Sequence, residues 1–153
     1  MEIQYITGDA TRPAGLGNKI IAHVCNDIGA WGAGFVLAIS KRWPQPKAEY
    51  LKEKRLRGLT LGTVEFVQVE ENTWVANVIA QRDIRSRDGV PPIRYDALKL
   101  CLDTLATYAQ ELRASVHMPR IGCGLAGGKW ELIEPLIRET LADVQVFVYD
   151  LPR

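Results

Sequence analysis

The sequence predicts an α/β fold, in which strands and helices alternate along a chain of 153 residues. Short apolar runs of strand length are separated by longer stretches with helical periodicity, the order typical of a sheet covered by helices. The apolar fraction of 47% and the charged fraction of 24% are average for globular proteins and argue against disorder. The length fits one domain, so we expect residues 1–153 to form a single domain.

The expected strands are short runs rich in β-branched and aromatic residues. The run at 19–25 is almost entirely apolar, as expected for a buried strand. Residues 63–69 and 73–80 flank a short turn at Glu71-Asn72, so we expect these two strands to pair as antiparallel neighbours. In chain order, the expected strands are 3–7, 19–25, 63–69, 73–80, 115–119 and 144–149.

The expected helices lie between these strands. The clearest is 94–112, in which apolar residues recur every three or four positions, at Leu98, Leu102, Leu105 and Tyr108. In the last helix we expect Leu132, Leu136 and Ile137 to face the core. In chain order, the expected helices are 34–41, 46–57, 94–112 and 130–141, and the longest irregular stretch is the polar segment 81–92.

The charge balance argues against a nucleic-acid partner. The chain has 19 basic and 18 acidic residues, a net charge of +1. Proteins that bind the phosphate backbone usually have a strong basic excess. An anionic ligand would therefore be held by local backbone amides and a few side chains rather than by a broad electrostatic field.

The termini and cysteines also narrow the class of protein. We find no basic stretch followed by an apolar one at the N-terminus, and no apolar run near the roughly 20 residues that span a bilayer. Cys25, Cys101 and Cys123 are widely spaced and odd in number, which argues against a disulfide framework or a zinc site. We therefore expect a cytoplasmic protein, a monomer, with no membrane contact, metal or cofactor.

Two glycine-rich segments each follow an expected strand and precede an expected helix. Residues 26–34 are NDIGAWGAG and residues 122–128 are GCGLAGG. Glycines at such places are often simple turns, but here they lie beyond the carboxyl ends of strands, where doubly wound sheets bind ligands. Glycine lets the backbone approach a ligand and turn its amides toward an anion, and a following helix adds its positive end. The pattern predicts a clamp for phosphate or pyrophosphate.

The glycine spacing disfavours two common nucleotide chemistries. Neither segment has the Lys-Ser or Lys-Thr that follows the glycines of a phosphate-binding loop. The order Gly29-x-x-Gly32-x-Gly34 differs from the dinucleotide fingerprint and comes too late after its strand. ATP hydrolysis and NAD-dependent redox chemistry are therefore not expected.

Three groups of these residues resemble macrodomains. They are Gly8-Asp9-Ala10, the stretch from His23 through Trp31-Gly32-Ala33-Gly34, and above all MPRIGCGL at 118–125 with the following Trp130. The chain resembles in particular the branch that contains the terminal ADP-ribose protein glycohydrolase and its bacterial and yeast relatives, over residues 3–151. This resemblance implies a three-layer α/β/α fold with a mixed, largely parallel central sheet and one ADP-ribose site at the strand ends.

The resemblance also implies a role for each part of the site. Asp9 would accept a hydrogen bond from the adenine amino group beside the backbone of Ala10, and Tyr149 is either an adenine platform or a core aromatic. Trp31 either lines the cleft or packs, and a glycine loop offers it little core to fill. The distal ribose would lie against Asn26, Gly29, Trp31, Gly32, Ala33 and Gly34, and the diphosphate against Gly122, Cys123, Gly124, Leu125, Ala126 and Gly127.

Two departures from the glycohydrolase pattern exclude its covalent route. The lysine that attacks the distal ribose would stand at Gln81, and the assisting aspartate would stand at Ala126. An amide cannot form a Schiff base and an alanine cannot move a proton. The remaining catalytic candidates are Asn26, Asp27 and Arg85, although the loop that carries Arg85 is equally well explained as a solvated charged loop.

Three other reactive residues are expected to be structural. Cys123 is better explained as a small residue in a tight loop than as a nucleophile. His23 and His117 lie within apolar strands, which favours core histidines that are fully hydrogen-bonded.

The expected function is removal of mono-ADP-ribose from protein acidic residues by activated water, so the partner is ADP-ribose or an ADP-ribosylated protein. Two alternatives stay open. One is a phosphatase acting on ADP-ribose 1″-phosphate, and the other is a non-enzymatic reader of ADP-ribosylated partners, which the missing lysine and carboxylate would suit.

Overall fold

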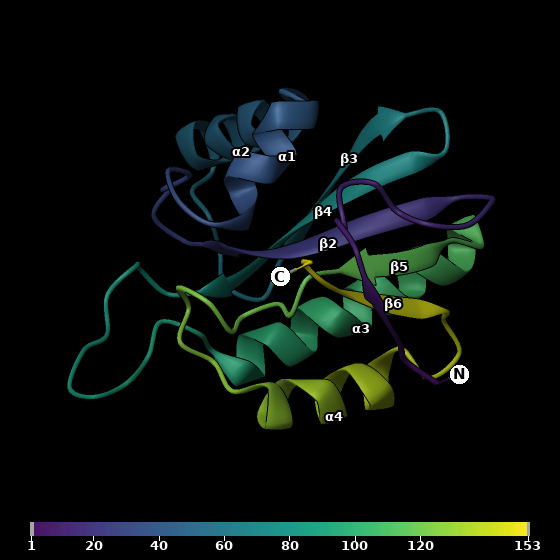
Figure 1. Ribbon diagram of the computed structural model, residues 1–153. Helices are drawn as coiled ribbons and strands as arrows, with labels where there is room; N and C mark the ends of the chain where they lie inside the picture. The colour runs from purple at the N-terminus through teal and green to yellow at the C-terminus, as the bar shows by residue number, and fades with distance from the viewer. Residues whose placement is uncertain (1, 153) are drawn as a thin grey trace.

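A computed structural model describes residues 2–152 as a six-stranded sheet with two helices on each face, a three-layer α/β/α fold (Figure 1). The strand and helix order agrees with the sequence-based prediction. The predicted boundaries differ from the observed ones by one residue or none, except at the start of β6, where they differ by two. In chain order, the elements are β1 Gln4–Thr7, β2 Lys19–Asn26, α1 Phe35–Arg42, α2 Gln45–Leu56, β3 Val64–Glu70, β4 Thr73–Gln81, α3 Tyr95–Leu112, β5 Ser115–Met118, α4 Trp130–Thr140 and β6 Val146–Asp150.

The sheet is mixed but largely parallel, as predicted. Its strand order is β1-β6-β5-β2-β4-β3, and every neighbouring pair is parallel except β3 with β4. The antiparallel pair is the hairpin predicted from the turn at Glu71-Asn72. The five parallel strands therefore place their carboxyl ends along one edge of the sheet.

Each face of the sheet is covered by its own apolar cluster. Helices α3 and α4 enclose the larger cluster, to which Leu98, Leu102 and Leu105 contribute as predicted. Helices α1 and α2 cover the other face with a cluster that includes Trp31, Trp43 and Tyr50. No helix among residues 2–152 is long and apolar enough to cross a bilayer.

The prediction that Leu132 faces the core is wrong. Ile133 and Ile137 are fully buried and Leu136 packs against the cluster, whereas Leu132 is half exposed. Ile133 and Ile137 are four residues apart and share one side of α4, and Leu132 lies about 100° away from Ile133 around the helix. The prediction relied on the spacing of the leucines and therefore chose Leu132 in place of the neighbouring Ile133.

Two histidines are buried within the sheet and fully hydrogen-bonded, as the sequence predicted. His23 Nε2 lies 2.7 Å from Asn77 Oδ1, while His117 lies 2.7 Å from both Ser115 Oγ and the Tyr149 hydroxyl. Burial lowers the pKa of each imidazole from 6.5 to about 4. Both side chains are therefore neutral in the folded protein at neutral pH.

These histidines should make the fold acid-sensitive. In the unfolded chain they take up protons below about pH 6.5, whereas the folded protein resists protonation until about pH 4. The free energy of unfolding should therefore fall between these pH values, by up to about 3 kcal/mol for each histidine. Urea unfolding measured from pH 7.5 to pH 4.5 checks this, and His117→Asn should flatten the dependence. Equal slopes for the variant and the unsubstituted protein would contradict the assignment.

Candidate functional site

The predicted site residues meet at the edge where the parallel strands end. Asp9 follows β1, Asn26 ends β2, Gln81 ends β4 and Arg120 follows β5. Both glycine-rich segments start from this edge, and each leads into a helix, α1 or α4, as the sequence predicted. The fold thus brings the two segments to the same side of the molecule (Figure 1).

The first glycine-rich loop is held in shape by Asn26. Its Oδ1 accepts hydrogen bonds from the amides of Ile28 and Ala30, at 3.1 and 3.0 Å, and its Nδ2 donates to the Ala30 carbonyl at 2.7 Å. The hydroxyl of Tyr50, on α2, lies 2.6 Å from the Asn26 carbonyl oxygen and 2.8 Å from Oδ1. The Asn26 carboxamide is thus occupied by its own loop, which fits a positioning residue better than the predicted catalytic role.

Tyr50 is a residue of the site that the sequence did not reveal. It is completely buried beneath the loop, and its ring lies 5.2 Å from that of Trp31. In the sequence it is one apolar position of a charged helix, with no motif around it. Only the packing of α2 against the loop shows its role.

The expectation that Trp31 has little core to fill is wrong. Its ring is buried in the cluster under α1 and α2, packed edge-to-face 5.4 Å from His23. Its indole nitrogen donates a 2.7 Å hydrogen bond to Ser40 Oγ on α1. The loop turns this side chain inward, whereas the neighbouring Gly32, Ala33 and Gly34 are exposed.

Asp27 and Gln81 fix the start of the long loop at 82–92. Asp27 Oδ1 accepts a hydrogen bond from the Asp83 amide at 2.8 Å, and the Asp27 amide donates to the Gln81 carbonyl at 2.9 Å. Gln81 Nε2 donates to the Asp83 carbonyl at 2.9 Å. Arg85 is exposed farther along this loop, and among residues 2–152 it makes no hydrogen bond or ion pair with Asn26 or Asp27. The three predicted catalytic residues are therefore not joined in one contact network.

The second glycine-rich loop is a tight turn with an open outer side. Gly122 and Gly127 have positive φ angles of 75° and 74°, and the Gly128 amide donates to the Gly122 carbonyl at 2.7 Å. Ala126 is buried and its carbonyl accepts a hydrogen bond from Ile93, so this position packs inward. At Gly124, by contrast, a Cβ atom would meet nothing within 4 Å.

The two glycine-rich loops approach each other across this edge. Leu125 is largely exposed, and its Cδ1 lies 3.3 Å from the position that a Cβ on Gly34 would take. Gly34 has a φ of 82° and directly precedes the first turn of α1. Backbone of both loops and the positive end of a helix therefore meet at this edge, an arrangement suited to an anion.

A hollow of about 600 Å³ extends the edge toward β1, lined by Thr7, Arg120, Asp150, Leu151 and Pro152. Arg120 makes a two-pronged ion pair with Asp150, at 2.7 and 3.0 Å, and its guanidinium lies over the rings of Tyr5 and Trp130. This pair lowers the pKa of Asp150, so the carboxylate stays ionised. The sequence marked Arg120 only as part of the MPRIGCGL motif.

The adenine-side candidates are partly engaged in local structure. Asp9 Oδ1 accepts hydrogen bonds from the amide and hydroxyl of Thr11, at 2.8 and 2.7 Å, which shapes the turn around buried Ala10. Tyr149 is buried, and its hydroxyl accepts a 2.8 Å hydrogen bond from the Ala14 amide. Of the two explanations for Tyr149, these contacts favour the core aromatic.

Cys123 does not have the surroundings of a nucleophile. It is partly buried against the larger apolar cluster, and this burial raises the pKa of its thiol. A thiol with a raised pKa carries little thiolate at neutral pH. The loop uses Cys123 for packing, in line with the sequence-based interpretation.

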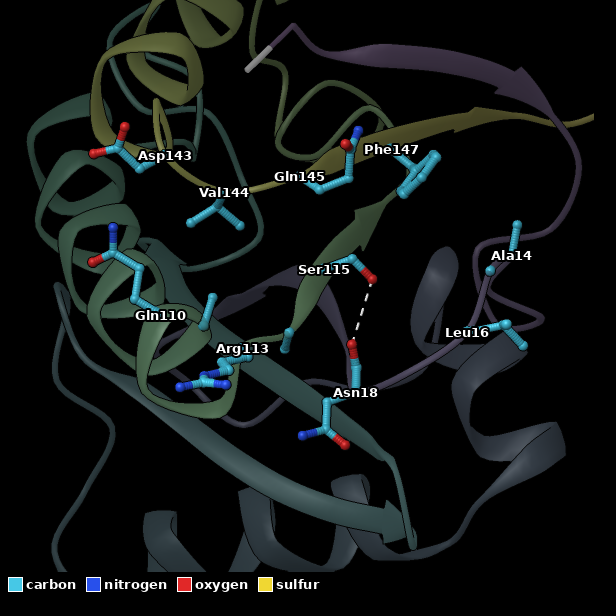
Figure 2. Close-up of a pocket in the computed structure, with 13 residues that line it drawn as sticks. Ala14, Leu16, Asn18, Gln110, Arg113, Ser115, Asp143, Val144, Gln145 and Phe147 are labelled. Atoms are coloured by element: carbon cyan, nitrogen blue, oxygen red, sulfur yellow. Dashed lines mark hydrogen bonds between the residues drawn. The ribbon is translucent and has the colours of Figure 1, made fainter.

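A second hollow, of about 550 Å³, lies at the opposite edge of the sheet (Figure 2). It is bordered by the amino ends of β2, β5 and β6 and by the end of α3, with Asn18, Arg113, Ser115 and Phe147 among its lining residues. None of the site residues predicted from the sequence lines this hollow. The candidate site is therefore the edge that carries the glycine-rich loops.

Loss of the Tyr50 hydroxyl should loosen the first loop. Tyr50→Phe removes the buried hydroxyl that donates to the two Asn26 oxygens, which should cost about 1–2 kcal/mol of unfolding free energy. Hydrogen exchange of the Ile28 and Ala30 amides should also become faster. The control is Tyr108→Phe, because the Tyr108 hydroxyl has no hydrogen bond within the described chain. Unchanged exchange at Ile28 and Ala30 in Tyr50→Phe would contradict the positioning role.

Solved structures share the whole fold. A protein of unknown function from Bacteroides thetaiotaomicron matches with a TM-score of 0.96 and 55% identity, over 99% of both chains. A macrodomain protein from Streptomyces coelicolor matches with a TM-score of 0.87 and 51% identity, over 97% of this chain and 99% of that one. No protein-family model matches the chain.

Curated relatives differ in how much of their length is matched. The mouse chromodomain-helicase-DNA-binding protein 1-like is 33% identical over 99% of this chain, which spans only 18% of that relative. The ADP-ribose 1″-phosphate phosphatase of Candida albicans is 26% identical, over 90% of this chain and 92% of the relative. The macrodomain protein from Streptomyces coelicolor is half identical to this chain and is matched over nearly its full length. The strand order and the two glycine-rich loops also agree with the resemblance to macrodomains seen in the sequence. The chain therefore belongs to the macrodomain family.

Proposed function

We propose that this macrodomain binds ADP-ribose at the glycine-rich edge and removes mono-ADP-ribose from protein acidic residues. The observation that carries the proposal is the facing pair of loops, with unobstructed space outside Gly124 and the start of α1 behind Gly34. A diphosphate suits an edge where backbone amides and a helix N-terminus meet. The similarity to a phosphatase of ADP-ribose 1″-phosphate supports the ligand class.

The ligand would extend across the edge in both directions from the diphosphate. Its adenine end would lie toward Asp9 and the hollow that Arg120 and Asp150 help to line. Its distal ribose would lie toward the first loop, where Gly32 has open space and Asn26 fixes the backbone. The loops would contribute to binding in two ways. Their glycines leave room for the ligand, and their backbone amides point toward it.

Hydrolysis by this protein would use water rather than a covalent intermediate. Gln81 stands where the glycohydrolase that the chain resembles has its lysine, and its amide is hydrogen-bonded to the Asp83 carbonyl. Asp27 is the carboxylate of the first loop, and its Oδ1 accepts a hydrogen bond from the Asp83 amide. In our proposal Asp27 and Arg85 orient the attacking water, and the bond that breaks joins the ribose to the side-chain carboxylate.

The phosphatase remains a second candidate function. The Candida albicans relative favours it, because its name gives that activity and it matches over nearly its whole length. The same edge would then hold ADP-ribose with its terminal phosphate toward the first loop. Release of phosphate from ADP-ribose 1″-phosphate, without release of ADP-ribose from modified protein, would select this activity. A reader would bind ADP-ribose and release neither product.

Substitution of Gly124 should abolish binding of ADP-ribose without unfolding the protein. Gly124 has no positive φ and open space around it, so a valine fits the backbone but occupies the place of the diphosphate. We expect Gly124→Val to weaken binding by about 100-fold or more in calorimetry, and Gly124→Ala to weaken it less. The unfolding free energy should change by no more than about 0.5 kcal/mol. Unchanged affinity in Gly124→Val would remove the second loop from the site.

The water-based route predicts turnover without a trapped adduct. A peptide with mono-ADP-ribose on glutamate should release free ADP-ribose over multiple turnovers, and borohydride added during turnover should leave no ADP-ribosyl group on the protein. Asp27→Asn should slow this release. Turnover that persists at full rate in both Asp27→Asn and Arg85→Ala would refute their assigned roles.

A further inference from the structure

Positive charge is concentrated around helix α2. Residues 41–57 contain seven of the 19 basic residues of the chain but only two of its 18 acidic residues. The near-neutral total therefore conceals a local excess of positive charge, with the remainder of the chain carrying a net negative charge. Residues 41–57 span the end of α1 and the whole of α2, which together form one outer layer of the fold (Figure 1).

The charges on α2 separate into two sides. With about 100° between successive residues, Lys47, Lys54 and Arg55 fall on one side of the helix, while Glu49 and Glu53 fall on the side that faces β3. Arg57 is neutralised by its ion pair with Glu53. The three basic side chains on the first side are exposed and form no ion pair within residues 2–152, and we call them the α2 basic surface: Lys47, Lys54 and Arg55.

This surface borders the ribose end of the candidate site. Lys54 Nζ lies 3.0 Å from the position that a Cβ on Gly29 would take, so its side chain rests against the first glycine-rich loop. Tyr50, one turn earlier on α2, holds the same loop from below through Asn26. The basic side of α2 thus begins where the distal ribose would be joined to a modified protein.

We propose that the α2 basic surface binds an acidic segment of the modified protein next to its ADP-ribosylated side chain. The proposal rests on the proposed function, because the first loop must hold the distal ribose for the segment to reach α2. From Lys47 to Arg55 the surface is about 12 Å long, which matches about four residues of extended peptide. Three separate cations fit the carboxylates of such a segment. The low net charge makes this short contact a better match than the broad field needed by nucleic acid.

The test compares two peptides that carry mono-ADP-ribose on glutamate, one with aspartates around it and one with serines. The protein should bind the acidic peptide about tenfold more tightly at low salt, because exposed ion pairs each contribute modestly. Lys54→Glu/Arg55→Glu should remove this preference while free ADP-ribose binds with unchanged affinity. The matched control, Lys99→Glu/Arg113→Glu, makes the same charge change on and beside α3, on the other face of the sheet, and should keep the preference.

A direct binding measurement separates this proposal from the proposed function. The same acidic peptide without ADP-ribose should shift the amide resonances of α2 in an NMR titration, and 300 mM salt should suppress the shifts. If free ADP-ribose does not bind, the proposed function fails. The NMR titration still shows in that case whether the α2 basic surface binds the acidic peptide. Equal affinity for the two modified peptides, absence of shifts on α2, or tighter binding of a single-stranded oligonucleotide than of the acidic peptide would each overturn the proposal.

Discussion

Strand β2 is hydrogen-bonded in parallel to β4 on one side and to β5 on the other, and this pairing constrains the remainder of the molecule. Parallel strands require crossovers that pass over the faces of the sheet, which accounts for the helices on both sides. The same pairing brings the ends of β2, β4 and β5 to one edge. The two glycine-rich segments face each other because each follows one of these strands.

The glycine-rich loops have little stiffness of their own, and buried side chains supply it. The first is fixed from below by Asn26 and Tyr50, and its one aromatic, Trp31, is anchored in the core. The second is folded by close backbone contacts between Gly122 and Gly128 and by the hydrogen bond from Ile93 to Ala126. Backbone amides can be presented to a ligand in a fixed geometry only because these inner contacts leave the outer side free.

The chemistry at the end of β4 depends on the long loop that follows it. Gln81 and Asp27 both bind the backbone of Asp83, so the polar groups nearest the first glycine-rich loop are also the anchors of the long loop. Asp83 has a φ of 59°, a conformation that a non-glycine residue adopts at a cost and that these anchors help to hold. Whether Arg85 can reach a substrate would therefore depend on how Gln81 and Asp27 hold this loop. Its place in the sequence alone does not decide this.

The sequence by itself determined the order of strands and helices, the antiparallel hairpin and the two glycine-rich segments, because hydrophobic periodicity and turn residues are local properties of the chain. It also identified His23 and His117 as core residues, since both stand inside apolar strands. Only the tertiary structure decided which way individual side chains point. Trp31 turns into the core, Leu132 turns out, and Tyr50 reaches Asn26 from another helix. These outcomes depend on contacts between segments far apart in the chain. The excess of basic residues at 41–57 can be counted in the sequence, but its position beside the first glycine-rich loop depends on such contacts too.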